Sequence, residues 1–252
     1  MSKGFSTDLV PILVAQGIEG AFHEWLDMTG KLLRTAPEYF VTVKVAQHLC
    51  AEIPAEQRTL LMEHEVSSVL RSAGGVQRGP ASKHLRAGGR MDLVLGRADG
   101  RPRVVIELKN GLYLQMNQGV RADLHRLCHA LLQGKNNTHL HSGLLAFFTS
   151  TRPPLTKRDS TARAYLRRRW LTEFRPLLQD WRWAGNKHSH YEKNLRINVG
   201  IRLHDLGPRG DKGAWAVVVV RVRRLTAAEQ AQQAKSASNQ TSNAALKSVR
   251  SA

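Results

Sequence analysis

The chain has 252 residues, 42% of them hydrophobic, so it is long enough for one large domain with a substantial core. Its 38 lysine and arginine residues against 20 aspartate and glutamate residues give a formal net charge of +18, which favours a polyanionic partner such as nucleic acid; the alternative is a basic protein without one. The two cysteines, Cys50 and Cys128, exclude a disulfide framework and suit reduced thiols in a cytoplasmic protein.

The N-terminal part of the chain predicts two helices and a strand. The apolar run 9–15 contains Pro11 and acidic neighbours, so it resembles neither a signal peptide nor a membrane span. Apolar residues recur at helical spacing over 18–34, and a second helix starts at Pro37 and stops near residue 53. Residues 59–70 read as a strand or bent strand, and a basic, glycine-rich loop follows over 71–89.

The remaining elements alternate between strand and helix patterns. Two strands joined by a turn at 98–100 are expected in 90–109, then a helix, a buried strand, a helical section rich in arginine and tryptophan, and two more strands. The tail can start as a helix in AAEQAQQA, but it lacks apolar residues to dock that helix and is expected to be disordered. The ranges that follow the hairpin are 116–133, 142–149, 160–183, 195–204, 214–224 and the tail 226–252.

Charged residues interrupt the two hairpin strands, RMDLVLGR and RPRVVIELK. Glu107 and Lys109 project on one face, because strand side chains alternate, and pairing of the strands brings Asp92 close to both. Two converging carboxylates are hard oxygen ligands that suit Mg²⁺ or Mn²⁺, and a nearby lysine can steer a water or stabilise developing charge. The alternative is a structural ion pair of Lys109 with Glu107 or Asp92 at a sheet edge.

The pattern D-x14-E-x-K, on two strands with one helix before them and one after, resembles the PD-(D/E)XK nuclease superfamily over residues 36–150. The resemblance implies an α/β, restriction-endonuclease-like αβββαβ core with a mixed central sheet. It also implies that Asp92 and Glu107 are metal ligands, that Lys109 is the catalytic lysine and that Mg²⁺ or Mn²⁺ is the cofactor. Met91 stands where the family name has proline.

The family often adds an acid from the first helix or strand, and two residues are candidates here. Glu38 opens the helix that begins near Pro37, where Holliday-junction-resolvase-like members place theirs, and Glu63 lies in the first strand. We favour Glu63, because a carboxylate among Leu60, Leu61 and Met62 needs a compensating partner. Asp123 and Arg126, three apart on the next helix, are expected to pair with each other and receive no catalytic role.

Two basic regions, residues 71–90 and 152–182, are expected to contact the phosphates of nucleic acid, most simply double-stranded DNA. Tryptophans interleaved with the second region can either stack on bases or brace the fold. His125 and His129, at i and i+4, are expected to lie on a packed or solvated helix face rather than to bind a metal. The residues assigned to nucleic acid are Arg78, Lys83, Arg86, Arg90, Arg163, Arg167 and Arg168.

The sequence thus predicts an N-terminal helical extension (1–35), a nuclease core (36–150), a basic helical segment with two strands that lengthens the same sheet (151–225), and the tail. The predicted activity is metal-dependent hydrolysis of DNA phosphodiester bonds. Family analogy alone adds a role in bacterial or phage defence or DNA processing, and a homodimer or a defence-system partner. The alternative is a catalytically silent nucleic-acid-binding module or recognition partner with the same fold.

Overall fold

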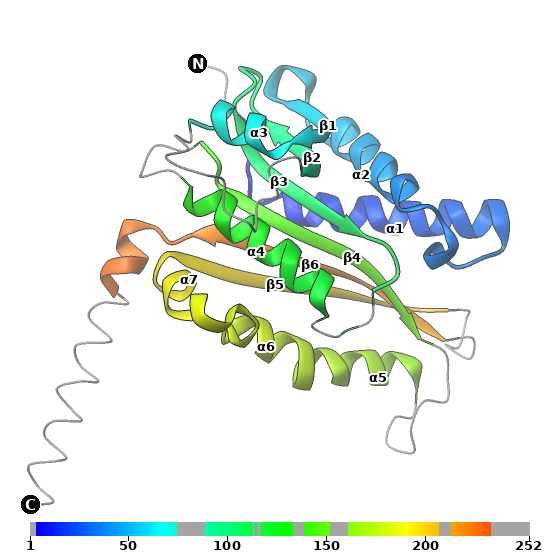
Figure 1. The fold of residues 1–252 in the computed structure, drawn as a ribbon. Coiled ribbons are helices and arrows are strands. Elements are labelled where there is room, and N and C mark those ends of the chain that lie inside the picture. Colours follow the sequence, from blue (N-terminus) through cyan, green and yellow to red (C-terminus); the bar gives the residue numbers. More distant parts are fainter. Residues whose placement is uncertain are drawn as a thin grey trace, which may run out of the picture.

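The computed structural model describes residues 4–74, 89–112, 114, 117–133, 139–151, 161–206 and 213–232. Helices cover both faces of a mixed six-stranded sheet, so the fold belongs to the α/β class (Figure 1). The strand order is β1-β2-β3-β4-β6-β5. The strands are β1 (Thr59–Glu65), β2 (Arg90–Gly96), β3 (Pro102–Lys109), β4 (Ser142–Thr151), β5 (Leu195–Asp205) and β6 (Ala214–Arg224).

The sheet is mixed because its third and fourth strands run parallel while its other neighbours run antiparallel. β2 and β3 form the predicted hairpin, whose turn uses Gly100 at φ +80°, a conformation that glycine adopts without steric cost. A parallel neighbour needs a crossover connection, which the helix between β3 and β4 supplies. β4 and β6 are the most deeply buried strands, since both their faces are covered.

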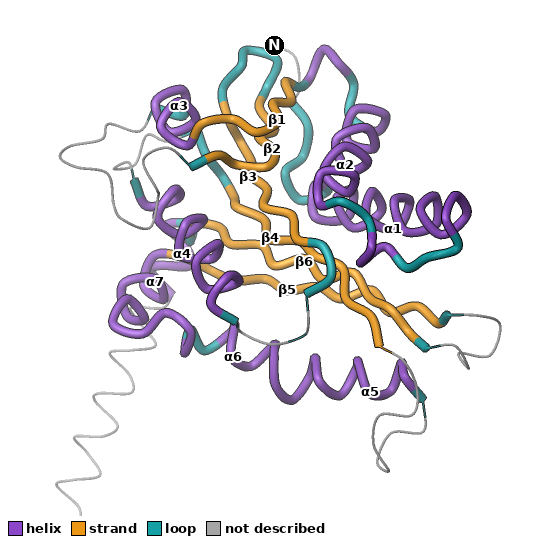
Figure 2. Tube along the Cα trace, turned by 45° about the vertical axis from the view of Figure 1, so that its right-hand side comes forward, coloured by secondary structure: helices purple, strands orange, loops and turns teal. Residues whose placement is uncertain are grey.

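The helices divide into two layers, one on each face of the sheet, and Figure 2 shows the arrangement from a second angle. The helices are α1 (Val10–Thr29), α2 (Glu38–Glu52), α3 (Val66–Ser72), α4 (Gln118–Leu132), α5 (Ala162–Arg169), α6 (Arg175–Gln179) and α7 (His188–Asn194). A π-helical turn, Trp170–Phe174, joins α5 to α6. One apolar core contains residues of α1 and α2, and the other contains residues of α3 to α7.

The N-terminal helix α1 packs directly on the sheet. The ring of Phe22 stacks on Trp215 of β6 with 3.9 Å between centroids, and on Phe148 of β4 with 5.5 Å. These aromatic contacts bury a large apolar area and tie the first helix to the last strand of the chain.

Most elements expected from the sequence are confirmed, including the hairpin, the helix after it, and the two late strands that lengthen the same sheet. The single strand expected over 59–70 is wrong in its second half, because the chain turns into α3 after Glu65. Val66, Val69 and Leu70 are all buried, and their i, i+3, i+4 spacing places them on one helix face.

The tail that the sequence assigns as disordered from residue 226 is ordered over 226–232, and the helical start that AAEQAQQA allows is confirmed. Residues 227–232 are helical, and the Glu229 carboxylate lies 2.6 Å from the Arg223 guanidinium and 3.1 Å from that of Arg196. These two ion pairs hold the helical turn to β5 and β6 although it has few apolar residues. The rest of the predicted tail lies outside the described residues.

Among the helices that the structure describes, none combines the length and apolarity that crossing a membrane requires.

Two glycines of α1 test the close contact between α1 and α2. A Cβ at Gly17 would lie 2.9 Å from the Val45 Cα, whereas a Cβ at Gly20 would meet nothing within 4 Å. We expect Gly17→Ala to lower the free energy of unfolding by about 1–3 kcal/mol through overpacking. Gly20→Ala should raise it by up to about 1 kcal/mol through helix propensity. Urea unfolding of both variants measures the difference, and equal effects would contradict the proposed packing.

Candidate active site

The β2–β3 hairpin brings Asp92 to the E-x-K segment, as the sequence predicts. The Asp92 carboxylate accepts a hydrogen bond from the backbone N–H of Leu108, with 2.6 Å between Oδ2 and N. This bond places the Asp92 carboxylate beside the backbone of Leu108, which lies between Glu107 and Lys109 in the sequence. Asp92 is partly buried.

Glu107 is the most deeply buried acid of the site, with 1% of its surface exposed. Its Oε1 lies 2.6 Å from an Nη atom of Arg126 on α4. A buried carboxylate without a cationic partner costs several kcal/mol, and the ion pair with Arg126 offsets part of this cost. The partner of Glu107 is therefore Arg126, not Lys109 as the structural alternative supposed.

Lys109 ends β3 and lies between two helices. Its ammonium is 2.9 Å from Oε1 of Glu38, the first residue of α2, and 3.9 Å from Oδ2 of Asp123 on α4. The lysine side chain is 28% exposed, so it is held by carboxylates and still open to solvent. A cation at this place can donate hydrogen bonds to an incoming anion.

Asp123 and Arg126 pair with each other, as expected from their spacing, at 3.0 Å. Asp123 also contacts Lys109, and Arg126 also contacts Glu107, which their spacing on the helix does not predict. One sequence feature does indicate contact with the sheet. Asp123 and Arg126 lie on the same face of α4 as Val120, Leu124 and Leu127, which is the face that packs on the sheet.

Together these residues form a charged cluster at the junction of β2, β3, α2 and α4. Its members are Glu38, Asp92, Lys109, Glu107, Asp123 and Arg126. Four carboxylates against two cations leave two negative charges uncompensated when every group is ionised. A surplus of this size, carried by hard oxygen ligands, fits a divalent cation such as Mg²⁺.

Within the described ranges, no group of three or more His, Cys, Asp or Glu side chains is arranged to hold a metal ion. Mg²⁺ commonly takes one or two carboxylates and completes its shell with waters and substrate phosphates. The pair Asp92 and Glu107 is compatible with that coordination.

Burial and charge shift the proton equilibria of the cluster. Burial raises the pKa of Glu107 to about 8, although Arg126 opposes the shift. Burial also raises the pKa of Asp92, against the Leu108 N–H and Lys109. For Lys109 and Arg126, burial alone would lower the pKa, but the neighbouring carboxylates outweigh it and raise both values. The cations therefore stay charged at neutral pH, and Asp92 and Glu107 bind protons more readily than ordinary acidic side chains do.

Both candidates for the additional acid lie close to Asp92. The register of β1 and β2 runs from Met62↔Leu93 to His64↔Met91, so Glu63 lies across from Asp92, and its charge helps to raise the pKa of Asp92. Glu63 is exposed and has φ +50°, an uncommon backbone conformation for this residue. A carboxylate exposed to solvent in this way needs no compensating partner. The direct contact with Lys109 favours Glu38 instead.

The basic residues assigned to nucleic acid have different surroundings. Arg90 is exposed at the start of β2, two residues before Asp92, and Arg167 is exposed on α5. Arg163 pairs with Asp205 at 3.0 Å, and Arg168 lies 4.0 Å from Glu173. Arg78, Lys83 and Arg86 lie outside the described residues.

The tryptophans of the second basic region brace the fold. Trp170, Trp181 and Trp183 are each 3–4% exposed, which leaves no ring face for stacking on bases. His125 and His129 are on a packed helix face, as expected: the Nδ1 atom of His125 lies 2.9 Å from the Tyr191 hydroxyl, and the ring of His129 meets that of Tyr191 edge-on.

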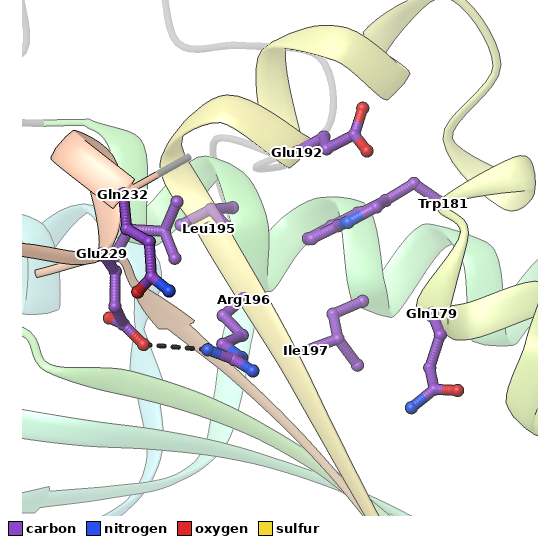
Figure 3. A pocket seen from close by; sticks show the side chains of 9 residues that line it. Gln179, Trp181, Glu192, Leu195, Arg196, Ile197, Glu229 and Gln232 are labelled. Atoms are coloured by element: carbon purple, nitrogen blue, oxygen red, sulfur yellow. Dashed lines mark hydrogen bonds and ion pairs between the residues drawn. The ribbon is translucent and has the colours of Figure 1, made fainter. Parts of the chain in front are cut away.

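A cavity of about 490 Å³ lies elsewhere, between β5, the segment before α7 and the helical turn at 227–232 (Figure 3). Arg196 and Glu229 form an ion pair on its wall, and Trp181 and Ile197 contribute apolar surface. Its described lining residues include no member of the charged cluster. We take the charged cluster as the candidate site because groups with perturbed pKa values converge there.

Comparison with protein-family models, with curated proteins and with solved structures finds no match to this chain.

The raised pKa of Glu107 predicts a pH-dependent stability for the metal-free protein. Between the ordinary value of 4.5 and about 8, the folded protein holds a proton that the unfolded chain has released. The free energy of unfolding should therefore fall with rising pH in this window, by up to about 1.4 kcal/mol per unit from this group. Glu107→Gln should remove that part of the slope. Urea unfolding from pH 5 to pH 8 measures it, and parallel curves for both proteins would contradict the assignment.

Proposed function

We propose that this chain is a nuclease that hydrolyses DNA phosphodiester bonds with the help of Mg²⁺ or Mn²⁺. The observation that carries the proposal is the junction of Asp92, Glu107 and Lys109 at the β2–β3 hairpin, with the Glu38 carboxylate 2.9 Å from the lysine ammonium. Two acids and a lysine held together beside a solvent-open edge are the groups that hydrolysis of a phosphodiester requires.

The order of elements supports the resemblance to PD-(D/E)XK nucleases. From Glu38 to Thr151 the chain forms α2, β1, β2, β3, α4 and β4, which is the αβββαβ order with the short helix α3 inserted. The acids and the lysine occupy the second and third of these strands, where the D-x14-E-x-K pattern places them.

Asp92 and Glu107 are the residues that would hold the cation. The metal, when bound, supplies Lewis-acid polarisation of the scissile phosphate and a lowered pKa for a bound water. The hydrogen bond from Leu108 N–H fixes the Asp92 carboxylate, and Arg126 fixes that of Glu107. Preorganised ligands of this kind lose little freedom on binding.

Lys109 would act on the phosphate itself. Its ammonium is partly exposed and can donate hydrogen bonds to a non-bridging oxygen, which stabilises the negative charge that develops during attack. Glu38, exposed at the start of α2, would hold the Lys109 ammonium in place through their ion pair. Its carboxylate can also accept a proton from an attacking water.

The substrate class follows from charge. A net charge of +18 favours a polyanion, and the exposed Arg90, two residues before Asp92, and the exposed Arg167 of α5 are side chains that can contact phosphates. The last residue of α5, Arg169, reaches the connection between β3 and α4. One of its Nη atoms donates to the Leu114 carbonyl at 3.5 Å. We propose double-stranded DNA as the substrate and, by the resemblance, a role in defence or DNA processing.

Cleavage assays test the proposal. Purified protein with Mg²⁺ or Mn²⁺ should cut plasmid and linear duplex DNA, and chelation of the metal should stop the reaction. Asp92→Asn, Glu107→Gln and Lys109→Met should each lower the cleavage rate by at least about 100-fold, because each removes a group that acts on the reacting phosphate or its metal. DNA binding by the three variants should persist, as measured by fluorescence anisotropy.

Two substitutions serve as matched controls. Asp99 lies in the turn of the same hairpin, 3.6 Å from Arg101, and Lys44 lies on the same helix as Glu38, 2.6 Å from Glu24. Asp99→Asn and Lys44→Met should cleave at the wild-type rate. Cleavage that survives in all three site variants would refute the site assignment.

One observation favours a second function, a catalytically silent nucleic-acid-binding module. Glu107 and Lys109 already have partners within the protein, so their charges are satisfied without a ligand. Such a module would bind DNA through its basic surface and leave the cluster as a structural element.

Calorimetry with Mn²⁺ separates the two functions. The nuclease should bind Mn²⁺, and Asp92→Asn should weaken this binding by at least about tenfold, because the cation loses one of two carboxylate ligands. A protein that binds DNA in a salt-dependent manner and takes up no Mn²⁺ would be the silent module.

A further inference from the structure

Five members of the charged cluster form a continuous series of alternating charge. The members, in order, are Glu38, Lys109, Asp123, Arg126 and Glu107. The successive distances between charged atoms are 2.9, 3.9, 3.0 and 2.6 Å. The series begins on α2, crosses the end of β3, continues through α4 and returns to β3.

We infer that Asp123 and Arg126 of α4 are positioning residues that hold Glu107 and Lys109 in the geometry needed for catalysis. The inference rests on the proposed nuclease function and extends it to residues outside the D-x14-E-x-K pattern. Neither residue is assigned contact with the metal or the DNA; each acts through its partner on β3.

The guanidinium of Arg126 is the centre of this arrangement. One Nη atom donates to Oε1 of Glu107 and the other donates to Oδ1 of Asp123, so a single planar group fixes two carboxylates at once. The side chain is 11% exposed, so water competes little for these bonds. A lysine has one compact ammonium and cannot reproduce a planar fork with two separate donors.

Asp123 links the arginine to the catalytic lysine. Its Oδ1 accepts from Arg126, and its Oδ2 lies 3.9 Å from the ammonium of Lys109. Because Arg126 fixes one oxygen, the other is aimed at the end of β3. The orientation of Lys109 therefore depends on α4 as well as on Glu38.

The helix that bears this pair is itself firmly placed. Asn117 caps its first turn by accepting from the N–H of Val120 at 2.9 Å. Leu124, Leu127 and Leu131 are completely buried in the core shared with the sheet. A helix anchored at its cap and along its apolar face can transmit a fixed position to Asp123 and Arg126.

Stability alone is a weak reason to keep these charges in the interior. Replacing a buried ion pair by packed apolar residues is often neutral or stabilising. Outer groups that orient metal ligands, in contrast, commonly change metal affinity by about 10- to 100-fold when they are altered.

Charge-conserving variants distinguish a positioning role from a structural one. Arg126→Lys keeps the charge beside Glu107 but removes the fork, so we expect Mn²⁺ affinity to fall by about tenfold or more. Asp123→Glu keeps its charge but displaces both oxygens, and it should weaken Mn²⁺ binding in the same direction and lower kcat more than it changes KM. Calorimetry in the absence of DNA measures the affinity, and circular dichroism establishes that each variant is folded.

The matched control is Arg221→Lys. Arg221 pairs with Asp8 at the same distance of 2.6 Å and is 12% exposed, but it lies on β6, outside the charged cluster. This variant should bind Mn²⁺ like the wild type. If Arg126→Lys fails to fold, Asp123→Glu decides the question.

The outcomes separate this inference from the function on which it rests. Wild-type Mn²⁺ affinity in the folded charge-conserving variants, even with a lowered melting temperature, would overturn the positioning role and leave the nuclease proposal intact. Failure of the wild-type protein to bind Mn²⁺ would overturn both. A selective loss of affinity in the α4 variants, with none in Arg221→Lys, would support the inference.

Discussion

Glu107 places a carboxylate in the middle of a sheet, almost completely removed from water, and the rest of the site depends on how that charge is compensated. The compensation comes from Arg126, on a helix that follows β3 and covers the same face. The ion pair of Glu107 and Arg126 joins β3 to α4, and Asp123 contacts both Arg126 and Lys109 at the end of β3. The polar centre therefore depends on the apolar packing that holds α4 against the sheet.

The topology explains why the charges gather at one edge. A hairpin returns Asp92 to the level of Leu108, and the crossover to a parallel strand requires a helix at the end of β3. The same end receives the first turn of α2, so Glu38 reaches Lys109 from the other layer. Groups from two strands and two helices meet there, and acidic side chains outnumber cations by two.

How much could be predicted differs between strand-borne and helix-borne residues. The alternation of strand side chains and the turn at Gly100 were enough to place Asp92 beside the E-x-K segment. The preference for Glu63 rested on its apolar neighbours in the sequence, which do not show that this side chain is exposed to solvent. Asp123 and Arg126 were expected only to pair with each other, since local spacing says nothing of the strand beneath the helix.

The sequence by itself determined the α/β alternation of elements, the hairpin, and the residue types near its ends, since these depend on periodicity and turn chemistry within short segments. Only the tertiary structure decided which charges are partners. Arg126 takes Glu107, and Lys109 takes Glu38, 71 positions away in the chain. These pairings depend on burial and on the placement of whole elements. A charged side chain removed from water pairs with the opposite charge that packing brings within hydrogen-bond distance.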